Sequence, residues 1–270
     1  MHYVDLHIHS FYSDGTMSPA EIINEAEQNN VSVISITDHN VLEGSQEAIL
    51  LTRNTNISCI SGVELDAIHN DVNYHILGYG VDLENKTFIR RVKRNRELLE
   101  EVNIKLIKKM ENDYNNISLE DYKSFNYKRN LGGWKALHYF VEKGITSSLL
   151  EGFQLYKKYN HNYTCVKFPS IEEISTWIHE ACGKAVLAHP GKIIISEDKK
   201  IFRNSLLDVV QSGIDGIECY YPSHSQEIID TCLEVCNERN LLITSGSDCH
   251  GTFENTTIGQ LCTEVDVLRL

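Results

Sequence analysis

Residues 3–39 read YVDLHIHSFYSDGTMSPAEIINEAEQNNVSVISITDH, and their pattern indicates the fold class. Tyr3 to Leu6 forms a short apolar run that predicts a strand. Ser18 followed by Pro19 predicts a helix start, with Ser18 as the N-cap and Pro19 at the first helical position. Val31 to Ile36 is a continuous apolar segment, as in a buried parallel strand. Strand, helix and strand in succession predict a parallel α/β architecture.

The same alternation continues in two further parts of the chain. Before residue 82 we expect a helix at about 42–52 and strands at 58–65 and 74–79. After residue 164 we expect helices at 170–181, 202–212 and 225–240, alternating with strands at 185–188, 216–221 and 241–245.

The middle of the chain differs from both flanks. Residues 87–110, 133–143 and 147–156 carry helical patterns, and no strand signal of comparable strength lies between them. We therefore predict an all-helical insertion at 82–164 in an α/β unit formed by residues 1–81 and 165–270. Arg90 to Arg96 is locally basic, which is typical of a solvated helix face, although it would also suit a phosphate entrance.

Composition excludes several classes of protein. Hydrophobic residues make up 41% and charged residues 23% of the 270, as in globular proteins. No apolar run approaches the roughly 20 residues that span a bilayer, and MHYVDLHIHS lacks the features of a secretory signal. These observations predict a cytoplasmic protein with no membrane partner. None of the eight cysteines forms a CxxC pair, so we expect reduced thiols.

The net charge constrains the partners. With 38 acidic and 25 basic side chains the formal charge is -13, which disfavours duplex nucleic acid. A nucleotide or short oligonucleotide stays compatible, because bound metal ions can reverse the local field.

Histidines gather at the ends of predicted strands. His7 and His9 are two residues apart, so both rings point to the same side of the first strand. Taken alone, the pair fits a metal site and a pair of capping histidines equally well. The metal interpretation becomes stronger because four later strands end in a histidine or carboxylate, at TDH 37–39, GVE 62–64, HP 189–190 and SDCH 247–250.

Imidazole and carboxylate ligands suit Zn²⁺, Mn²⁺ or Fe²⁺. The potential ligands are too many for one tetrahedral ion, so we expect two or three divalent transition-metal ions. A cysteine ligand is not needed, and Cys249 should point away from Asp248 and His250 by strand alternation. Such a site can lower the pKa of a bridging water and hold the oxygens of a phosphate.

This pattern resembles the PHP (polymerase and histidinol phosphatase) superfamily. The resemblance rests on DLHIHS at 5–10, Asp14, TDHN at 37–40, GVE at 62–64, His75 in HILGYG, AHP at 188–190 and SDCH at 247–250. It implies a distorted seven-stranded β/α barrel, similar to a TIM barrel, with a trinuclear metal centre. It also implies a phosphoesterase in which a metal-bridging hydroxide attacks phosphorus.

The resemblance further implies nine metal ligands, which are also the expected catalytic residues. His7, His9, Glu64 and Asp248 would hold one ion, Glu64, His75 and His189 a second, and Asp14, His39 and His250 the third.

Within the superfamily the interrupted barrel resembles enzymes acting on nucleotides, such as 3',5'-nucleotide bisphosphate phosphatases and RNA 5'-end exonucleases. The expected substrate is therefore a small nucleotide or short oligonucleotide. That branch carries a Gly-Arg-Pro-His-like stretch where this chain has YKRNLGGW at 127–134, which leaves Arg129 as the candidate phosphate contact. His224 is a candidate substrate contact or general acid, and equally a helix N-cap residue. Asp38 is expected to orient a metal ligand.

Three other functions stay open at this point. A histidinol-phosphate-type or other small-metabolite phosphatase would use the same ions. An amidohydrolase-like enzyme would usually carry a metal-bridging lysine after a middle strand, whereas Lys184 precedes its strand. A non-catalytic metal-stabilised module often lacks ligands, so the apparently complete set favours an enzyme.

Overall fold

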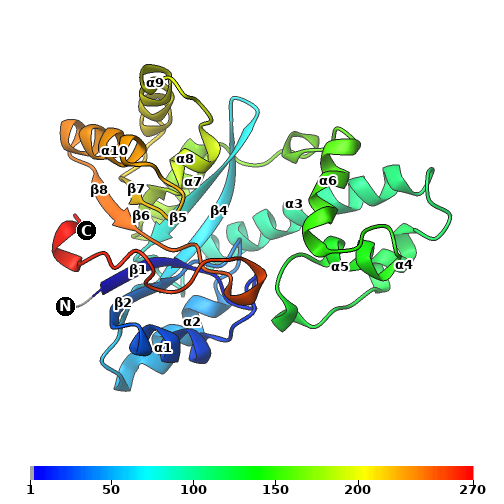
Figure 1. Ribbon diagram of the computed structural model, residues 1–270, viewed down its shortest axis with the longest axis horizontal. Helices are drawn as coiled ribbons and strands as arrows, with labels where there is room; N and C mark the ends of the chain where they lie inside the picture. Colours follow the sequence, from blue (N-terminus) through cyan, green and yellow to red (C-terminus); the bar gives the residue numbers. More distant parts are fainter. Residues whose placement is uncertain (1–2, 270) are drawn as a thin grey trace.

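A computed structural model describes residues 3–269 as a mixed α/β protein (Figure 1). The strands are β1 Tyr3–Ile8, β2 Val31–Ile36, β3 Ser58–Cys59, β4 Gly62–His69, β5 Val72–Tyr79, β6 Lys184–Leu187, β7 Gly216–Tyr220 and β8 Leu242–Ser245. They form two sheets, with the orders β1-β2-β3 and β4-β5-β6-β7-β8. Isolated bridges connect the two sheets, between His39 after β2 and Glu64 in β4, and between Ile8 in β1 and Cys249 after β8. The α/β class is confirmed, and the described strands lie in a three-stranded and a five-stranded sheet, so the expected seven-stranded barrel stays a prediction.

Helices surround these sheets. They are α1 Pro19–Gln28, α2 Glu43–Leu51, α3 Lys86–Met110, α4 Leu119–Ser124, α5 Lys135–Glu142, α6 Leu149–Lys158, α7 Ile171–Glu180, α8 Pro190–Ile193, α9 Lys199–Val210 and α10 Gln226–Arg239. Short 3₁₀ turns lie at Thr52–Asn54, Arg129–Leu131, Tyr163–Cys165, Gly251–Phe253 and Val265–Val267. In Figure 1, α1 and α2 lie on one side of the strands and α7 to α10 on the other, while α3 to α6 extend away from both termini.

Local sequence explains the helix starts. The Ser18 hydroxyl accepts a hydrogen bond from the Glu21 amide, and the Glu21 carboxylate accepts one from the Ser18 amide. Ser170 and Glu173 form the same capping box at α7. Each box provides partners for two backbone groups that would otherwise lack them. The predicted Ser18–Pro19 start is confirmed.

The direction of β5 departs from the expected parallel arrangement. β4 and β5 form an antiparallel hairpin, and β5 also pairs antiparallel with β6. The turn consists of Asn70 and Asp71, with φ angles of 49° and 61°. Left-handed conformations at both central residues are those of a type I′ turn, which matches the twist of a tight hairpin. The sequence HNDV therefore contained a hairpin signal that strand alternation alone does not reveal.

The predicted strand 58–65 was wrong as a single element. β3 pairs with β2 in the first sheet, whereas β4 starts the second sheet only three residues later. Gly62 permits this transition, because a Cβ there would lie 2.1 Å from the Ser35 hydroxyl oxygen. The chain can cross β2 closely only without a side chain at this position.

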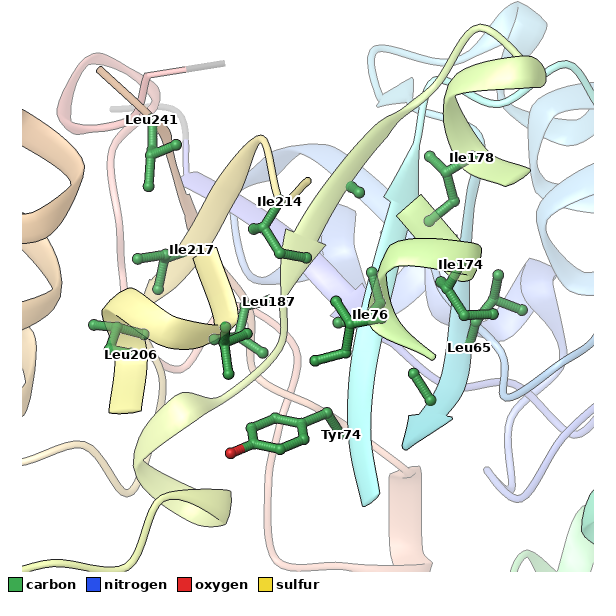
Figure 2. Packing of buried hydrophobic residues seen from close by; sticks show 14 of the residues in the cluster. Leu65, Tyr74, Ile76, Ile174, Ile178, Leu187, Leu206, Ile214, Ile217 and Leu241 are labelled. Atoms are coloured by element: carbon green, nitrogen blue, oxygen red, sulfur yellow. The ribbon is translucent and has the colours of Figure 1, made fainter. Parts of the chain in front are cut away.

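The larger apolar core lies between the second sheet and the helices of one face. Figure 2 shows Ile174 and Ile178 of α7 near Leu65 and Ile76 of the hairpin, within one buried cluster. Burying one such side chain contributes about 1.5–3 kcal/mol. A second cluster, which includes Ile22 of α1, packs under the first sheet. The two cores fix the strands from which the polar site projects.

The segment between β5 and β6 is helical throughout its described regular elements, and it has its own core. Tyr122, Leu137 and Phe140 are fully buried in that core. However, Phe88 and Val92 in the first turns of α3 belong to the core of the second sheet. The division at residues 82 and 164 stays a prediction, since α3 packs in both regions.

Two further observations concern the whole described chain. All eight cysteines are free thiols, as expected. Within residues 3–269 no helix combines the length and apolar character needed to cross a bilayer.

Candidate metal centre

The end of β1 delivers the first two histidines. His7 and His9 are both fully buried, and their Nε2 atoms lie 3.1 Å apart. Ile8 between them points into the apolar core beneath the first sheet. Strand alternation thus separates core from site within three residues, as the sequence predicted.

A first group of potential ligand atoms forms around this pair. His7, His9, Glu64 and Asp248 each offer one atom, and these atoms all lie within 4.8 Å of one another. Glu64 Oε2 lies 3.3 Å and Asp248 Oδ1 3.1 Å from His9 Nε2. Cys249 stays outside this group and donates from its Sγ to the Thr256 carbonyl. The group has the same members as the first expected ligand set.

The other groups differ in detail from the expected sets. His9, Asp14, His39 and His250 form one group, which adds His9 to the expected third set. His39, Glu64 and His75 form another, in which His39 takes the place expected for His189. His189 Nε2 nevertheless lies 3.1 Å from Glu64 Oε1. The structure therefore brings all nine residues together, while their assignment to individual ions stays a prediction.

The positions of the nine ligand candidates on the strands explain why their side chains converge. Glu64 and His75 project from within the β4–β5 hairpin rather than from strand ends, which differs from the expectation for Glu64. The other ligand candidates lie at the end of β1 or in the segments after β1, β2, β6 and β8. His189 and Asp248 adopt left-handed φ angles of 31° and 53°, which turn the chain sharply after β6 and β8. Such conformations are costly for residues other than glycine and concentrate at functional sites.

The donor set fits divalent ions. Asp14 Oδ1, Glu64 Oε2, His75 Nδ1 and His189 Nδ1 are buried without a hydrogen-bond partner. Burying such atoms without partners is unfavourable, and ion ligation would satisfy those that face a ligand group. Eight of the nine candidates are buried, and His75 is partly buried. Imidazole and carboxylate donors of this kind suit Zn, Mn or Fe.

Charges within the cluster shift its titration strongly. Burial lowers the pKa of His9, but hydrogen bonds with Asp248 and Glu64 outweigh it and raise the pKa to about 10. His75 behaves alike, with burial opposed by Glu64 and Asp66 and a pKa of about 10. For His39 burial prevails and lowers the pKa to about 4. The carboxylates thus stabilise positive charge on neighbouring histidines, and they would stabilise the charge of a bound metal ion in the same way.

A carboxylate that sequence reasoning missed supports two of these histidines. Glu218 is fully buried in β7, and its Oε1 lies 3.0 Å from His7 Nδ1. Its Oε2 accepts a hydrogen bond from the His189 amide. A carboxylate at this position fixes the tautomer and orientation of a metal-binding imidazole. The available signal was an acidic residue within the otherwise apolar strand GIECY.

Asp38 contacts the loop after β1 instead of the adjacent His39 that we expected it to orient. Its carboxylate accepts hydrogen bonds from the Ser10 amide and from the hydroxyls of Ser10 and Ser13. The Ser13 hydroxyl oxygen lies 3.5 Å from His9 Nδ1. Asp38 therefore fixes the loop after β1 and acts on the surroundings of His9, whereas we expected it to orient the adjacent His39.

His224 does not face the cluster. Its Nδ1 lies 2.9 Å from the Cys219 carbonyl oxygen, and its Nε2 accepts a hydrogen bond from the Gly191 amide. Both ring nitrogens are thus engaged by backbone groups. This geometry favours a structural role that holds α8 against β7, and it does not support the alternative of a substrate contact.

Two cavities open beside the cluster. The first, of about 230 Å³, is lined by Asp14, His39, His75, Asp248 and His250 among others. The second, of about 440 Å³, is lined by Arg129, Arg96, Lys93 and several aromatic side chains. Leu99 and Trp134 line both cavities, so the two are neighbours. Arg129 thus lines the cavity next to the one at the cluster, and it does not line the first cavity.

Trp134 lies close to the cluster and lines both cavities. Its ring centroid lies 5.5 Å from that of His39. The Arg96 guanidinium lies 4.9 Å from the Trp134 centroid, and Arg96 also donates to the His39 carbonyl. The basic residues of the run 90–96 therefore have different surroundings. Lys93 and Arg96 line the second cavity, whereas Arg91 forms an ion pair with Glu180.

Known proteins share this sequence pattern and fold. A 3',5'-nucleoside bisphosphate phosphatase of Chromobacterium violaceum is 26% identical over 262 residues, covering 93% of this chain and 88% of the relative. A 5'-3' exoribonuclease of Haemophilus influenzae is 25% identical over 255 residues, covering 91% and 89%. The solved structure of a candidate metal-dependent phosphoesterase from Bifidobacterium adolescentis superposes with a TM-score of 0.79 at 22% identity, covering 98% and 93%.

The family comparison covers most of the chain. The model of the PHP domain matches residues 5–244, a range that contains the candidate ligands from β1, β2, the hairpin and β6 and ends just before Asp248 and His250. By that match, the chain belongs to the PHP domain family.

Proposed function

We propose that this PHP phosphoesterase hydrolyses the phosphate ester of a small nucleotide or a short oligonucleotide. The observation that carries the proposal is the position of the histidine and carboxylate cluster beside a cavity with cationic and aromatic walls. The phosphatase and exoribonuclease names of the relatives support the same substrate class.

Two or three divalent ions would be held by the nine residues already described, and Glu64, His9 and His39 each belong to two of the groups. When bound, such ions activate water and neutralise charge on a phosphoryl group. The structure fits this chemistry, because the groups are buried, preorganised and supported by Glu218.

The chain's own residues would bind the remainder of the substrate. The second cavity carries Lys93, Arg96, Arg129 and Lys135 together with Glu97 and Glu100, so its walls hold more basic than acidic groups. Guanidinium groups grip phosphate oxygens through two parallel hydrogen bonds. Tyr12, Phe125, Tyr127 and Trp134 offer aromatic surface for a base. The helical segment 82–164 therefore supplies much of the substrate wall in this proposal.

Charge and cavity size favour a small substrate. A cavity of about 440 Å³ suits a ligand of nucleotide size. With a formal charge of -13 the chain lacks the excess of cations that would track a long polyanion. Affinity should therefore not increase with length as it does when many phosphates are neutralised.

Arg129→Ala tests the proposal directly. The variant should raise KM, lower kcat, or both, by about tenfold for a nucleoside bisphosphate, because one charge-assisted contact is lost. An activated ester without a second phosphate should be affected much less. Arg53→Ala is the matched control, since Arg53 is exposed in the turn after α2 and lines neither cavity.

Phosphate release from Mn²⁺-loaded protein measures each outcome. Equal losses on both substrates would remove Arg129 from the binding site. Efficient hydrolysis of non-nucleotide phosphate esters alone would favour the small-metabolite phosphatase, and efficient cleavage of long duplex DNA would overturn the small-substrate proposal.

A further inference from the structure

Lys192 holds a distinct position at the cluster. It lies in α8, three residues after His189, and its side chain is 46% exposed. Within residues 3–269 it is the one lysine or arginine lining the 230 Å³ cavity. The same cavity is lined by Asp14, Asp66, Asp248 and Glu254. A phosphate entering there meets four carboxylates and a single basic side chain of the chain itself.

The two carboxylate oxygens of Asp248 have different partners, and Lys192 contacts only one of them. Oδ1 faces the cluster, 3.1 Å from His9 Nε2. Oδ2 accepts hydrogen bonds from the Lys192 ammonium at 3.1 Å and from the Tyr221 hydroxyl at 2.9 Å. Tyr221 is buried and does not line the cavity, whereas Lys192 does. One partner of Oδ2 is therefore neutral and buried, and the other is charged and accessible.

The two partners of Oδ2 can therefore have different roles: Tyr221 can orient Asp248, and Lys192 can also bind a ligand in the cavity. The Tyr221 hydroxyl alone can fix the carboxylate, because a buried hydrogen bond of 2.9 Å defines its direction. The Lys192 ammonium has three donor hydrogens on a flexible stem, so donors stay free for a second acceptor at the cavity. Orientation of Asp248 does not require that additional charge.

We propose that Lys192 is a substrate-binding residue whose ammonium group contacts the non-bridging oxygens of the scissile phosphate. The proposal rests on the proposed phosphoesterase function and adds a cation inside the metal cavity to the cations of the second cavity. A phosphomonoester would thus be held by Lys192 at its reacting end and by residues such as Arg129 at its far end. Lys192 also positions Asp248, but through an oxygen that it shares with Tyr221.

The experiment measures the affinity of the Mn²⁺-loaded protein for inorganic phosphate by isothermal calorimetry. Lys192→Met should weaken phosphate binding by about tenfold or more, as expected when one charge-assisted hydrogen bond is lost. Lys192→Arg should retain most of the affinity, because the charge and donors are kept. Lys192→Gln provides a polar variant should the methionine variant fold poorly.

Two matched variants separate binding from orientation. Tyr221→Phe removes the other donor to Asp248 Oδ2, so it should lower manganese content or affinity and change phosphate affinity little at saturating Mn²⁺. Lys199→Met removes a lysine that is 43% exposed and lies 3.0 Å from Glu234, outside the cavity, and it should change neither quantity.

The outcomes are distinguishable. Unchanged phosphate affinity in Lys192→Met, with a loss of manganese like that of Tyr221→Phe, would overturn the proposal and leave Lys192 as an orienting contact. If the wild-type protein binds phosphate through Lys192 yet releases none from any nucleotide, the proposed function fails while the binding site stands.

Discussion

At the scale of single residues, Glu64 is the centre of the site. Its two oxygens lie within 3.4 Å of ring nitrogens of His7, His9, His39, His75 and His189. Burial raises the pKa of Glu64, but the surrounding histidines outweigh it and lower the pKa well below its usual range. A carboxylate kept ionised in a buried place by so many imidazoles is suited to bridging two cations.

Glu64→Gln is therefore expected to be among the most damaging conservative changes. It keeps the size of the side chain but removes the charge, so the protein should lose at least about one ion and activity should fall more than about a hundredfold. Metal analysis and phosphate release measure the two effects. His69→Gln is the control, because His69 pairs with Asp208 on the surface away from the cluster. Equal losses in the two variants would show that the ligand assignment is wrong.

Glu218→Gln tests whether Glu218, which is not itself a ligand candidate, supports metal binding by orienting His7 and His189. The single amide oxygen can accept from His7 Nδ1 or from the His189 amide but not from both, and it no longer offers a negative charge to the imidazole. We expect metal affinity to fall about 10- to 100-fold with the fold preserved. Competition with a chelator measures the affinity, and circular dichroism reports the fold. A variant with wild-type affinity would exclude this supporting role.

Most of the ligand candidates could be predicted because they lie at or just after strand ends in short polar motifs, whereas two lie within the β4–β5 hairpin. It missed Glu218 and Lys192 for different reasons. Glu218 lies inside an apolar strand segment, where only burial shows that the carboxylate faces the site. Lys192 lies beyond the AHP motif, and its relation to Asp248 depends on the left-handed turn at His189. Contacts between distant segments cannot be obtained from local spacing.

At the scale of elements, the β4–β5 hairpin explains how Glu64 and His75 meet. Asp66 pairs directly with His75 in its antiparallel register, which places Glu64 and Asp66 on the face that carries His75. Glu64 Oε1 lies 2.9 Å and Asp66 Oδ1 3.4 Å from the His75 ring nitrogens. A shift of register by one residue would move these groups to the opposite face.

The turn that sets this register should be sensitive to substitution. Asp71→Gly is expected to leave stability unchanged or to raise it, because glycine adopts a left-handed conformation at no steric cost. Asp71→Val should destabilise by about 1–2 kcal/mol, since a branched side chain strains at a φ of 61°. Urea unfolding of both variants measures the difference. Equal stabilities would contradict the type I′ turn and the pairing that it defines.

Most elements could be predicted from periodicity and capping, since they depend on neighbouring residues. Periodicity did not give the strand direction, because β4 and β5 have buried runs that would look alike in a parallel sheet, and only the turn HNDV distinguishes the two arrangements. The division of residues 58–65 between two sheets likewise depends on the close approach of Gly62 to Ser35. Topology rests on such long-range packing, which local patterns do not record.

At the scale of the whole molecule, the site concentrates charge in a protein that is already acidic. Its formal charge is -13, and the carboxylates of Asp14, Glu64, Glu218 and Asp248 are buried together. In the metal-free protein, protons on the histidines whose pKa is raised offset part of this charge. Metal binding must displace those protons, so metal affinity, proton release and stability are linked.

The linkage between protonation and stability depends on the raised pKa values of two histidines. Burial lowers the pKa of His9 and His75, but neighbouring carboxylates outweigh it and raise both to about 10, compared with about 6.5 in an unfolded chain. A raised pKa stabilises the metal-free protein fully below pH ~6.5, and that contribution is lost as pH rises through about 10.

Bound Mn²⁺ replaces these protons, so competition from protons weakens as pH increases. The increase in Tm that saturating Mn²⁺ produces should therefore be larger at pH 9 than at pH 6. Thermal unfolding followed by circular dichroism, with Mn²⁺ or with a chelator, measures this increase at each pH. Calorimetry in buffers of different ionisation enthalpy should show the release of at least about two protons at pH 7. An increase in Tm that is equal or smaller at pH 9, without proton release, would mean that the ions do not bind at the protonated histidine cluster.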